Sequence, residues 1–163
     1  MSRYKVVAND IATPAVADTF RTILALIVAN TTGHRLRLRS LTIACSDGTP
    51  QDQQIAVRVN RTSNAGAGTP ATSLATTDIP KVDSTSRAPL STAGIDYSGG
   101  EPTTYETQPL FQTEFNDRGG FSKEWLPEDA PRANQNQTLG ILCAPRAAAA
   151  SRVTITAEFE DGF

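Results

Sequence analysis

The residues best suited to chemistry are three carboxylates around the single tryptophan. Glu124 precedes Trp125, and Glu128 and Asp129 follow it after a proline. Paired acids beside an aromatic platform are what glycoside hydrolysis requires. Exposed acids around a proline turn, with the tryptophan in the core or at an interface, explain the same pattern without catalysis. We favour the second interpretation, which predicts that the protein is not an enzyme.

The single histidine and the two cysteines form no second catalytic or metal-binding pattern. His34 follows a Thr-Thr-Gly turn with no histidine or paired carboxylate nearby in sequence, so we expect a solvent-exposed turn residue. Cys45 and Cys143 each end an apolar run, at a spacing that matches no metal or redox motif. We expect two buried free thiols, although a disulfide stays open. The sequence therefore predicts no metal and no cofactor.

Three arginines form the most distinctive charged pattern. Arg35, Arg37 and Arg39 alternate with leucines, so in a β-strand their side chains share one face. One interpretation is a solvated strand face. The other is a docking surface that pairs with acidic residues of a neighbouring subunit.

Length and composition restrict the class of protein. The 163 residues are 39% hydrophobic and 20% charged, which is typical of one soluble globular domain. The net charge of -2 argues against a polybasic nucleic-acid binder. The charge is uneven, with eight basic and four acidic residues in 1–61 but seven and thirteen in 62–163, a distribution that suits association of copies. The longest apolar run, 23–29, is far shorter than the ~20 residues of a membrane helix, and no targeting segment is evident.

Alternating apolar residues predict β-strands towards both ends of the chain. Residues 35–45 form the clearest strand, and its apolar positions change parity between Leu38 and Leu41. A strict period of two cannot bury both sets on one face, so we expect a β-bulge near Arg39 and Ser40. Further strands are predicted at 20–29 (with a helix as the alternative), 55–59, 139–143 and 153–159.

Two turns are also expected. Residues 111–115 and 121–125 look like the strands of a β-hairpin, joined by Asn-Asp-Arg-Gly-Gly. The segment 46–50, Ser-Asp-Gly-Thr-Pro, predicts another turn.

Residues 61–109 differ from the rest of the chain. Ser, Thr, Gly and Pro supply 26 of these 49 residues, with almost no apolar periodicity. Because a structureless loop of this length is unusual in a compact domain, we expect an ordered excursion across the surface. Its expected apolar anchors are Leu74, Ile79, Leu90, Ile95, Tyr97 and Tyr105.

These elements predict an all-β chain that folds as a single antiparallel β-sandwich of the jelly-roll type. Residues 1–17 are expected to form an N-terminal arm, with a first short strand beginning at Val6 and Val7 as the alternative. Residues 18–163 are expected to form the sandwich domain, which includes the 61–109 excursion.

Two stretches together resemble the jelly-roll head decoration (cement) proteins of tailed bacteriophages. The first is residues 20–60, with an apolar strand, a Thr-Thr-Gly turn, an arginine-leucine strand and Ile-Ala-Val-Arg-Val. The second is Phe-Ser-Lys-Glu-Trp-Leu-Pro at 121–127, Thr-Leu-Gly-Ile-Leu at 138–142 and Thr-Ile-Thr-Ala-Glu-Phe-Glu at 154–160. The resemblance implies a trimer on a capsid surface. It supplies no catalytic residues and no counterpart of the 61–109 excursion.

We therefore expect a virion structural protein that stabilises a capsid by binding the major capsid protein as a symmetric oligomer, most simply a homotrimer. It would be made in the host cytoplasm and located on the capsid surface, with no direct contact to nucleic acid or membrane. Residues 1–17 are the expected clamp. The alternative is a carbohydrate- or receptor-binding jelly-roll module of a phage fibre or tail. The candidate partner contacts are Arg35, Arg37, Arg39, Tyr97 and Tyr105.

Overall fold

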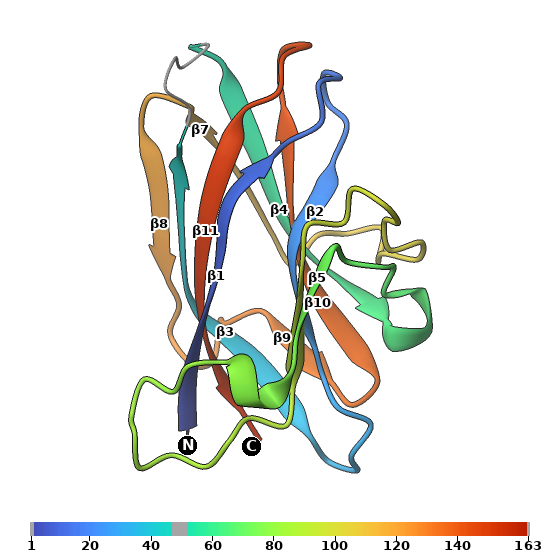
Figure 1. Cartoon of the computed structure of the whole chain (residues 1–163), viewed down its shortest axis with the longest axis vertical. Coiled ribbons are helices and arrows are strands. Elements are labelled where there is room, and N and C mark those ends of the chain that lie inside the picture. The colour runs from blue at the N-terminus through green and yellow to red at the C-terminus, as the bar shows by residue number, and fades with distance from the viewer. Residues whose placement is uncertain (1, 47–51, 163) are drawn as a thin grey trace.

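Two antiparallel β-sheets pack face to face in the computed structural model, which describes residues 2–46 and 52–162 (Figure 1). The five-stranded sheet contains β1 (Ser2–Ala12), β11 (Arg152–Asp161), β3 (Arg35–Cys45) and β8 (Gly120–Glu124) in that order, with β9 (Arg132–Asn134) also paired to β3. The six-stranded sheet has the order β5 (Thr72–Leu74), β6 (Thr92–Ile95), β2 (Arg21–Ile27), β10 (Gln137–Pro145), β4 (Gln54–Ser63) and β7 (Phe111–Asn116). The predicted turn at 46–50 lies outside the described residues, apart from Ser46.

The strand order is that of a jelly roll. When β5, β6 and β9 are set aside, the two sheets read β1-β11-β3-β8 and β2-β10-β4-β7. Every connection between consecutive strands of this set passes from one sheet to the other, except the one from β4 to β7. Two interlocked Greek keys of eight strands define the jelly-roll sandwich. The predicted fold class is confirmed.

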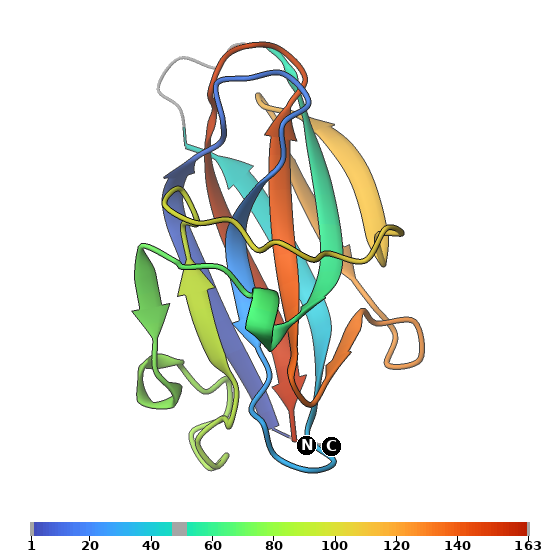
Figure 2. The ribbon, with the colours of Figure 1, turned by 90° about the vertical axis from the view of Figure 1, so that its right-hand side faces the viewer.

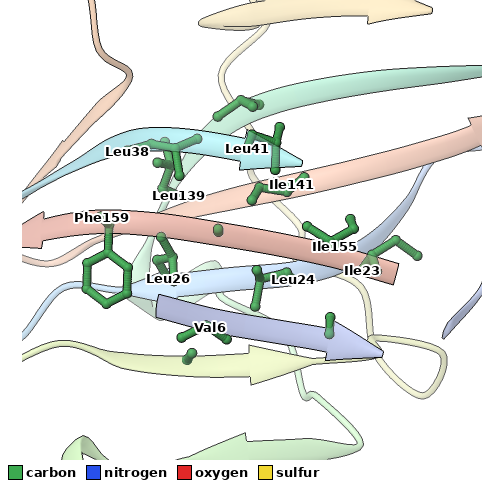
Figure 3. Packing of buried hydrophobic residues seen from close by; sticks show 14 of the residues in the cluster. Val6, Ile23, Leu24, Leu26, Leu38, Leu41, Leu139, Ile141, Ile155 and Phe159 are labelled. Carbon is green, nitrogen blue, oxygen red and sulfur yellow. The ribbon is translucent and has the colours of Figure 1, made fainter. Parts of the chain in front are cut away.

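The core between the sheets is built from alternate positions of the strands (Figure 3). The inward positions predicted for residues 55–59 and 153–159 are confirmed. Burying one large aliphatic side chain stabilises the fold by roughly 1.5–3 kcal/mol. The predicted inward residues of these two strands, all fully buried, are Ile55, Val57, Val59, Val153, Ile155, Ala157 and Phe159.

The bulge in β3 lies where the parity change predicted it. Glu158 pairs with Ser40 and Phe159 with Leu38, so Arg39 is the extra residue opposite β11. The bulge lets both apolar sets of β3 reach the core. Arg39 keeps the outward orientation of Arg35 and Arg37 and lies on the outer face of the sheet, where the site described below is located.

The predicted strand at 20–29 is β2, and it is buried along both faces. Residues 22–26 are all buried. Ile23, Leu24 and Leu26 pack in the core, while the outer side of β2 is covered by the segment 96–106 through bonds to Thr22. A strand covered on both faces needs no polar positions, which explains why this run does not alternate.

The expected N-terminal arm is wrong for residues 2–12, which form β1. Tyr4, Val6 and Ala8 are buried, and the strand pairs with β11 over nearly its whole length. The alternation is hidden in the sequence because a register shift between Ala8 and Ile11 places the polar residues Asn9 and Asp10 within the last part of the strand. The sandwich therefore begins with β1 rather than at residue 18.

The expected hairpin of residues 111–115 and 121–125 is also wrong. β7 pairs with β4 in one sheet and β8 pairs with β3 in the other, so the turn between them connects two edge strands across the sandwich. Both strands face inward with aromatic side chains. Phe111 stacks on Phe121 at 5.8 Å between ring centroids, and the rings of Phe111 and Trp125 form a T-shaped pair at 5.3 Å between centroids. Aromatic packing replaces the expected backbone pairing.

The excursion over residues 61–109 continues the six-stranded sheet. It contains the end of β4, two single-turn helices at Asn64–Gly66 and Thr76–Asp78, and the strands β5 and β6. Of the expected anchors, Ile79 and Tyr97 are buried and Leu74 and Ile95 pack against the core, whereas Leu90 is exposed. Among the described residues, no helix is long and apolar enough to cross a membrane.

Candidate functional site

The outer faces of the two sheets differ in what covers them. Figure 2 shows the segment that follows β6 crossing β2, β10 and β4 on the outside of the six-stranded sheet. No described segment covers the outer face of the five-stranded sheet in this way along β11 and β3, where the outward side chains, apart from Glu160, are exposed or half-buried. The candidate interaction surface is therefore on the five-stranded sheet.

The covered face carries a row of small residues that makes room for two tyrosines. Gly94, Ala25 and Gly140 lie opposite one another across β6, β2 and β10. A Cβ atom on Gly94 would lie 2.9 Å from the Tyr97 ring, and one on Gly140 would lie 2.9 Å from the Tyr105 ring. Each ring thus packs against a position that only glycine leaves open.

These contacts correct the prediction that Tyr97 and Tyr105 are available to a partner. Tyr97 is 1% exposed, and its hydroxyl has no hydrogen-bond partner among the described residues. The Tyr105 hydroxyl lies 2.8 Å from Thr22 Oγ1. Burial raises the pKa of Tyr97 to about 12, and the nearby Glu101 adds to this shift. Both tyrosines hold the excursion on its own sheet.

Glu101 fastens the same segment. Its two carboxylate oxygens accept hydrogen bonds from the Thr22 backbone N–H at 2.9 and 3.0 Å. Desolvation raises the pKa of Glu101, because burial penalises the ionised form more than these bonds favour it. The cluster of Thr22, Glu101, Tyr97 and Tyr105 is internal to the fold.

The open face of the five-stranded sheet is organised in rows that run from β1 across β11 and β3. The strand registers give the members of each row. The rows are Val7–Thr156–Thr42–Ser122, Lys5–Glu158–Ser40–Glu124 and Arg3–Glu160–Arg37–Arg132.

An arginine cluster surrounds Glu160 at one end of this face. Arg37 Nε donates to Glu160 Oε2, while Arg3 Nε and Arg39 Nε lie 3.5 and 3.8 Å from Glu160 Oε1. The Glu160 side chain is 7% exposed. Three guanidinium groups thus share one buried carboxylate, and we call Arg3, Arg37, Arg39 and Glu160 the arginine cluster.

The structure brings two residues of the predicted arginine stripe into this cluster. Arg37 and Arg39 both contact Glu160, whereas Arg35 is exposed at the beginning of β3, away from these contacts. Sequence reasoning missed Arg3 and Glu160. Alternation in 153–159 indicates that the neighbouring Glu160 continues the outward series, but its pairing with Arg37 depends on the register of two strands 123 residues apart.

A cavity of about 150 Å³ opens next to the cluster. This is well above the roughly 10–15 Å³ that one water molecule occupies on the same measure. Its lining is mainly charged and is contributed by β1, β3, β8 and β11. The lining residues are Arg3, Arg39, Ser40, Glu124, Trp125 and Glu158.

Of the three acidic residues around Trp125, Glu124 lines the cavity, whereas Glu128 and Asp129 do not. Trp125 is buried against Phe111, and Glu124 lines the cavity from the end of β8. The backbone carbonyl of Glu128 accepts a bond from the Arg132 side chain at 3.1 Å. Within residues 2–46 and 52–162, no group of three or more His, Cys, Asp or Glu residues is placed to hold a metal ion.

His34 is buried rather than solvent-exposed, which corrects the sequence interpretation. His34 Nε2 lies 2.6 Å from Asp161 Oδ1 and 3.3 Å from Ser91 Oγ. Ser91 Oγ donates to Asp161 Oδ1 at 2.8 Å, and the N–H groups of Leu90 and Ser91 donate to Oδ2. A hydrolytic triad needs serine and aspartate on different imidazole nitrogens. Here Nε2 faces both, so the trio fastens the excursion to β11.

Fold and surface together define a jelly-roll sandwich with one self-covered face and one open charged face. No protein-family model matches the chain, and no curated protein matches it. Among solved structures, the chain is similar to the crystal structure of the infectious bursal disease virus VP2 subviral particle, at 11% sequence identity and a TM-score of 0.22. The similarity covers 97% of this chain and 41% of that one, so the chain spans less than half of that protein's length. A likeness at this TM-score carries no argument about function.

Proposed function

We propose that the protein is a virion structural protein that binds the major capsid protein through the open face of its five-stranded sheet. In this proposal it decorates the capsid surface as a homotrimer, after synthesis in the host cytoplasm. The observation that carries the proposal is the difference between the two sheet faces. The chain covers one face with its own excursion and leaves the other open.

The charge of the open face supports a protein partner. The rows through Arg3 and Lys5, together with Arg39, hold five cationic and three anionic residues, which leaves two positive charges. The whole chain has a net charge of -2. A local positive surface on an acidic protein steers it towards acidic partner surfaces and sets the docking orientation.

A sugar-binding module would use Trp125 and the three tyrosines to stack on a sugar ring. Tyr4 and Tyr97 are fully buried, the Tyr105 hydroxyl is bonded to Thr22, and Trp125 is 8% exposed. Carbohydrate recognition of the expected kind needs exposed aromatic faces. We therefore put forward capsid binding in preference to sugar binding.

The first prediction tests the open face with a matched pair of substitutions. Thr42→Arg places a long side chain in the middle of this face, where Thr42 is exposed. Thr107→Arg makes the same change on the excursion that covers the opposite sheet. We expect Thr42→Arg to weaken co-sedimentation with capsids lacking the protein at least tenfold, because it blocks close approach, and Thr107→Arg to leave it unchanged.

Light scattering after size-exclusion chromatography measures the number of copies in the same samples. Normal capsid binding by Thr42→Arg, or equal loss in both variants, would contradict the assignment of the open face. A wild-type protein that does not bind capsids would contradict the proposed function itself. A monomer both in solution and on capsids would remove the trimer from the proposal.

A further inference from the structure

We infer that the cavity beside the arginine cluster binds one carboxylate side chain of the partner protein, held between Arg3 and Arg39. This inference rests on the proposed function, since it names what the capsid protein would insert into the open face. The occupant is an aspartate or glutamate side chain that projects from the partner's surface. Four observations lead to it.

The first observation is the unsatisfied hydrogen-bonding capacity of Arg39. Its Nε and Nη1 atoms are buried and have no hydrogen-bond partner among the described residues. The distance of 3.8 Å from Nε to Glu160 is within ion-pair range but too long for a hydrogen bond. A buried charged donor without an acceptor costs free energy that an incoming acceptor recovers.

The second observation is that Glu160 supplies too few hydrogen-bond acceptors for the three guanidinium groups around it. Each guanidinium group has five N–H donors, whereas one carboxylate has two oxygens. Arg37 makes the closest contact, and Arg3 and Arg39 remain at 3.5 and 3.8 Å from the other oxygen. The two loosely held arginines are the two that line the cavity.

The third observation is the position of the remaining acids. Glu124 and Glu158 also line the cavity, and Glu158 faces Lys5 across the pairing of β1 with β11. These carboxylates repel a doubly charged phosphate more strongly than a singly charged carboxylate. Arginine also matches the planar carboxylate through paired N–H···O bonds. The cavity therefore selects a carboxylate over a phosphate.

The fourth observation concerns the source of the carboxylate. Several acids of this chain already have an arginine partner within it, which disfavours a second copy of the chain as the donor. These pairs are Asp10–Arg152, Asp18–Arg146, Asp52–Arg118 and Glu106–Arg61. The net positive open face complements an acidic surface on a different protein. We therefore commit to a side chain of the capsid partner.

The test is a titration of the full chain with capped glutamate, the amide of N-acetylglutamate, followed by nuclear magnetic resonance. Trp125 lines the cavity and is the single tryptophan, so its indole N–H signal reports occupancy without ambiguity. We expect capped glutamate to shift this signal and the Arg39 Nε–H signal in a saturable manner. Capped glutamine, which has the same shape without the charge, should shift neither, and inorganic phosphate should bind more weakly than glutamate.

Two arginine variants and one matched control complete the test. Arg39→Gln is expected to weaken glutamate binding at least tenfold. Arg58→Gln is the control, because Arg58 lies on the opposite sheet, against Phe20 and Gln112, and its loss should leave binding unchanged. Arg3→Gln is the second variant if Arg39→Gln does not fold, since the Arg3 side chain is half exposed. Circular dichroism confirms that each variant is folded.

The outcomes separate this inference from the proposed function. Equal binding of glutamate and glutamine, stronger binding of phosphate, or full binding by the folded arginine variants would each overturn the carboxylate site. If Arg39→Gln dissociates an oligomer without weakening capsid binding, the carboxylate comes from a second copy of the chain. That result would also overturn the inference of a carboxylate from the capsid partner. If capped glutamate binds as expected but the wild-type protein does not bind capsids, the proposed function is contradicted while the carboxylate site is supported.

Discussion

Two tyrosines show how the environment of one atom decides whether a residue stabilises the fold. Tyr97 and Tyr105 both pack over a glycine of the six-stranded sheet. The Tyr105 hydroxyl is bonded to Thr22, whereas the Tyr97 hydroxyl is buried without a partner among the described residues. A buried hydroxyl is favourable only where it finds a hydrogen bond. The ring of Tyr97 therefore stabilises the fold, and its hydroxyl does not.

Removing each hydroxyl should change stability in opposite directions. Tyr97→Phe deletes an unsatisfied buried group and is expected to raise the free energy of unfolding by about 1 kcal/mol. Tyr105→Phe deletes a hydrogen bond and leaves Thr22 short of a partner, so it should lower that free energy by about 1 kcal/mol. Urea denaturation of the two variants measures both values. Equal destabilisation by both would mean that Tyr97 has an acceptor in solution.

At the scale of elements, the largest difference between prediction and structure is β1, which was expected to be an arm and is a strand of the five-stranded sheet. Its inward residues are in the core and its outward residues are on the open face, so this strand contributes to both the fold and the site. Removal of residues 2–12 would expose the core along β11. Truncation of this segment therefore cannot test it as a clamp, because loss of binding would follow from unfolding.

Two neighbouring valines test the role of β1 directly. Val6 is 1% exposed and Val7 is 43% exposed. Val6→Ala should lower the free energy of unfolding by about 2 kcal/mol through lost burial and the remaining cavity. Val7→Ala, the matched control, should stay within about 0.5 kcal/mol of the wild type. Chemical denaturation measures both, and equal small effects would favour a detached arm.

The elements differ in how far the sequence could predict them. The parity change between Leu38 and Leu41 was sufficient to locate the bulge, because only an extra residue lets both leucines face the core. Strand β1 was missed because its own register shift at Asn9 and Asp10 breaks the alternation. The pairing partners of β7 and β8 were missed because a short turn can join strands within a sheet or between sheets. The arginine cluster combines residues from β1, β3 and β11, and its composition follows from tertiary register alone.

At the scale of the whole molecule, several buried groups hold their protons more tightly than usual. Burial raises the pKa of Tyr97 to about 12, and it also raises the pKa values of Tyr105 and of the Cys143 thiol. In the unfolded chain these groups ionise at their ordinary values, near 8.5 for cysteine and 10 for tyrosine. The folded state is therefore the state that binds more protons at alkaline pH.

The contribution of these three groups to the free energy of unfolding should consequently be fully present below about pH 8.5 and should decrease as the pH rises towards 12. Each group that is ionised only in the unfolded state contributes a slope of up to about 1.4 kcal/mol per pH unit. The steepest loss is expected above pH 10, where the two tyrosines add to Cys143. Denaturation curves across this range measure the slope, and Tyr97→Phe should reduce it. A stability that is constant from pH 8 to pH 11 would contradict the buried state of all three groups.

The pairing of β1 with β11 brings the first residue of β1 and the last residue of β11 together. Ser2 lies opposite Asp161, and both chain ends emerge at the same end of the sandwich (Figure 1). A short peptide joining them would close the backbone into a ring with little distortion of either strand. New ends could then be opened between Arg118 and Gly119, two exposed residues of the turn that links the two sheets. The jelly roll is thus suited to circular permutation, and a cargo fused before β1 or after β11 would project from a single, defined pole.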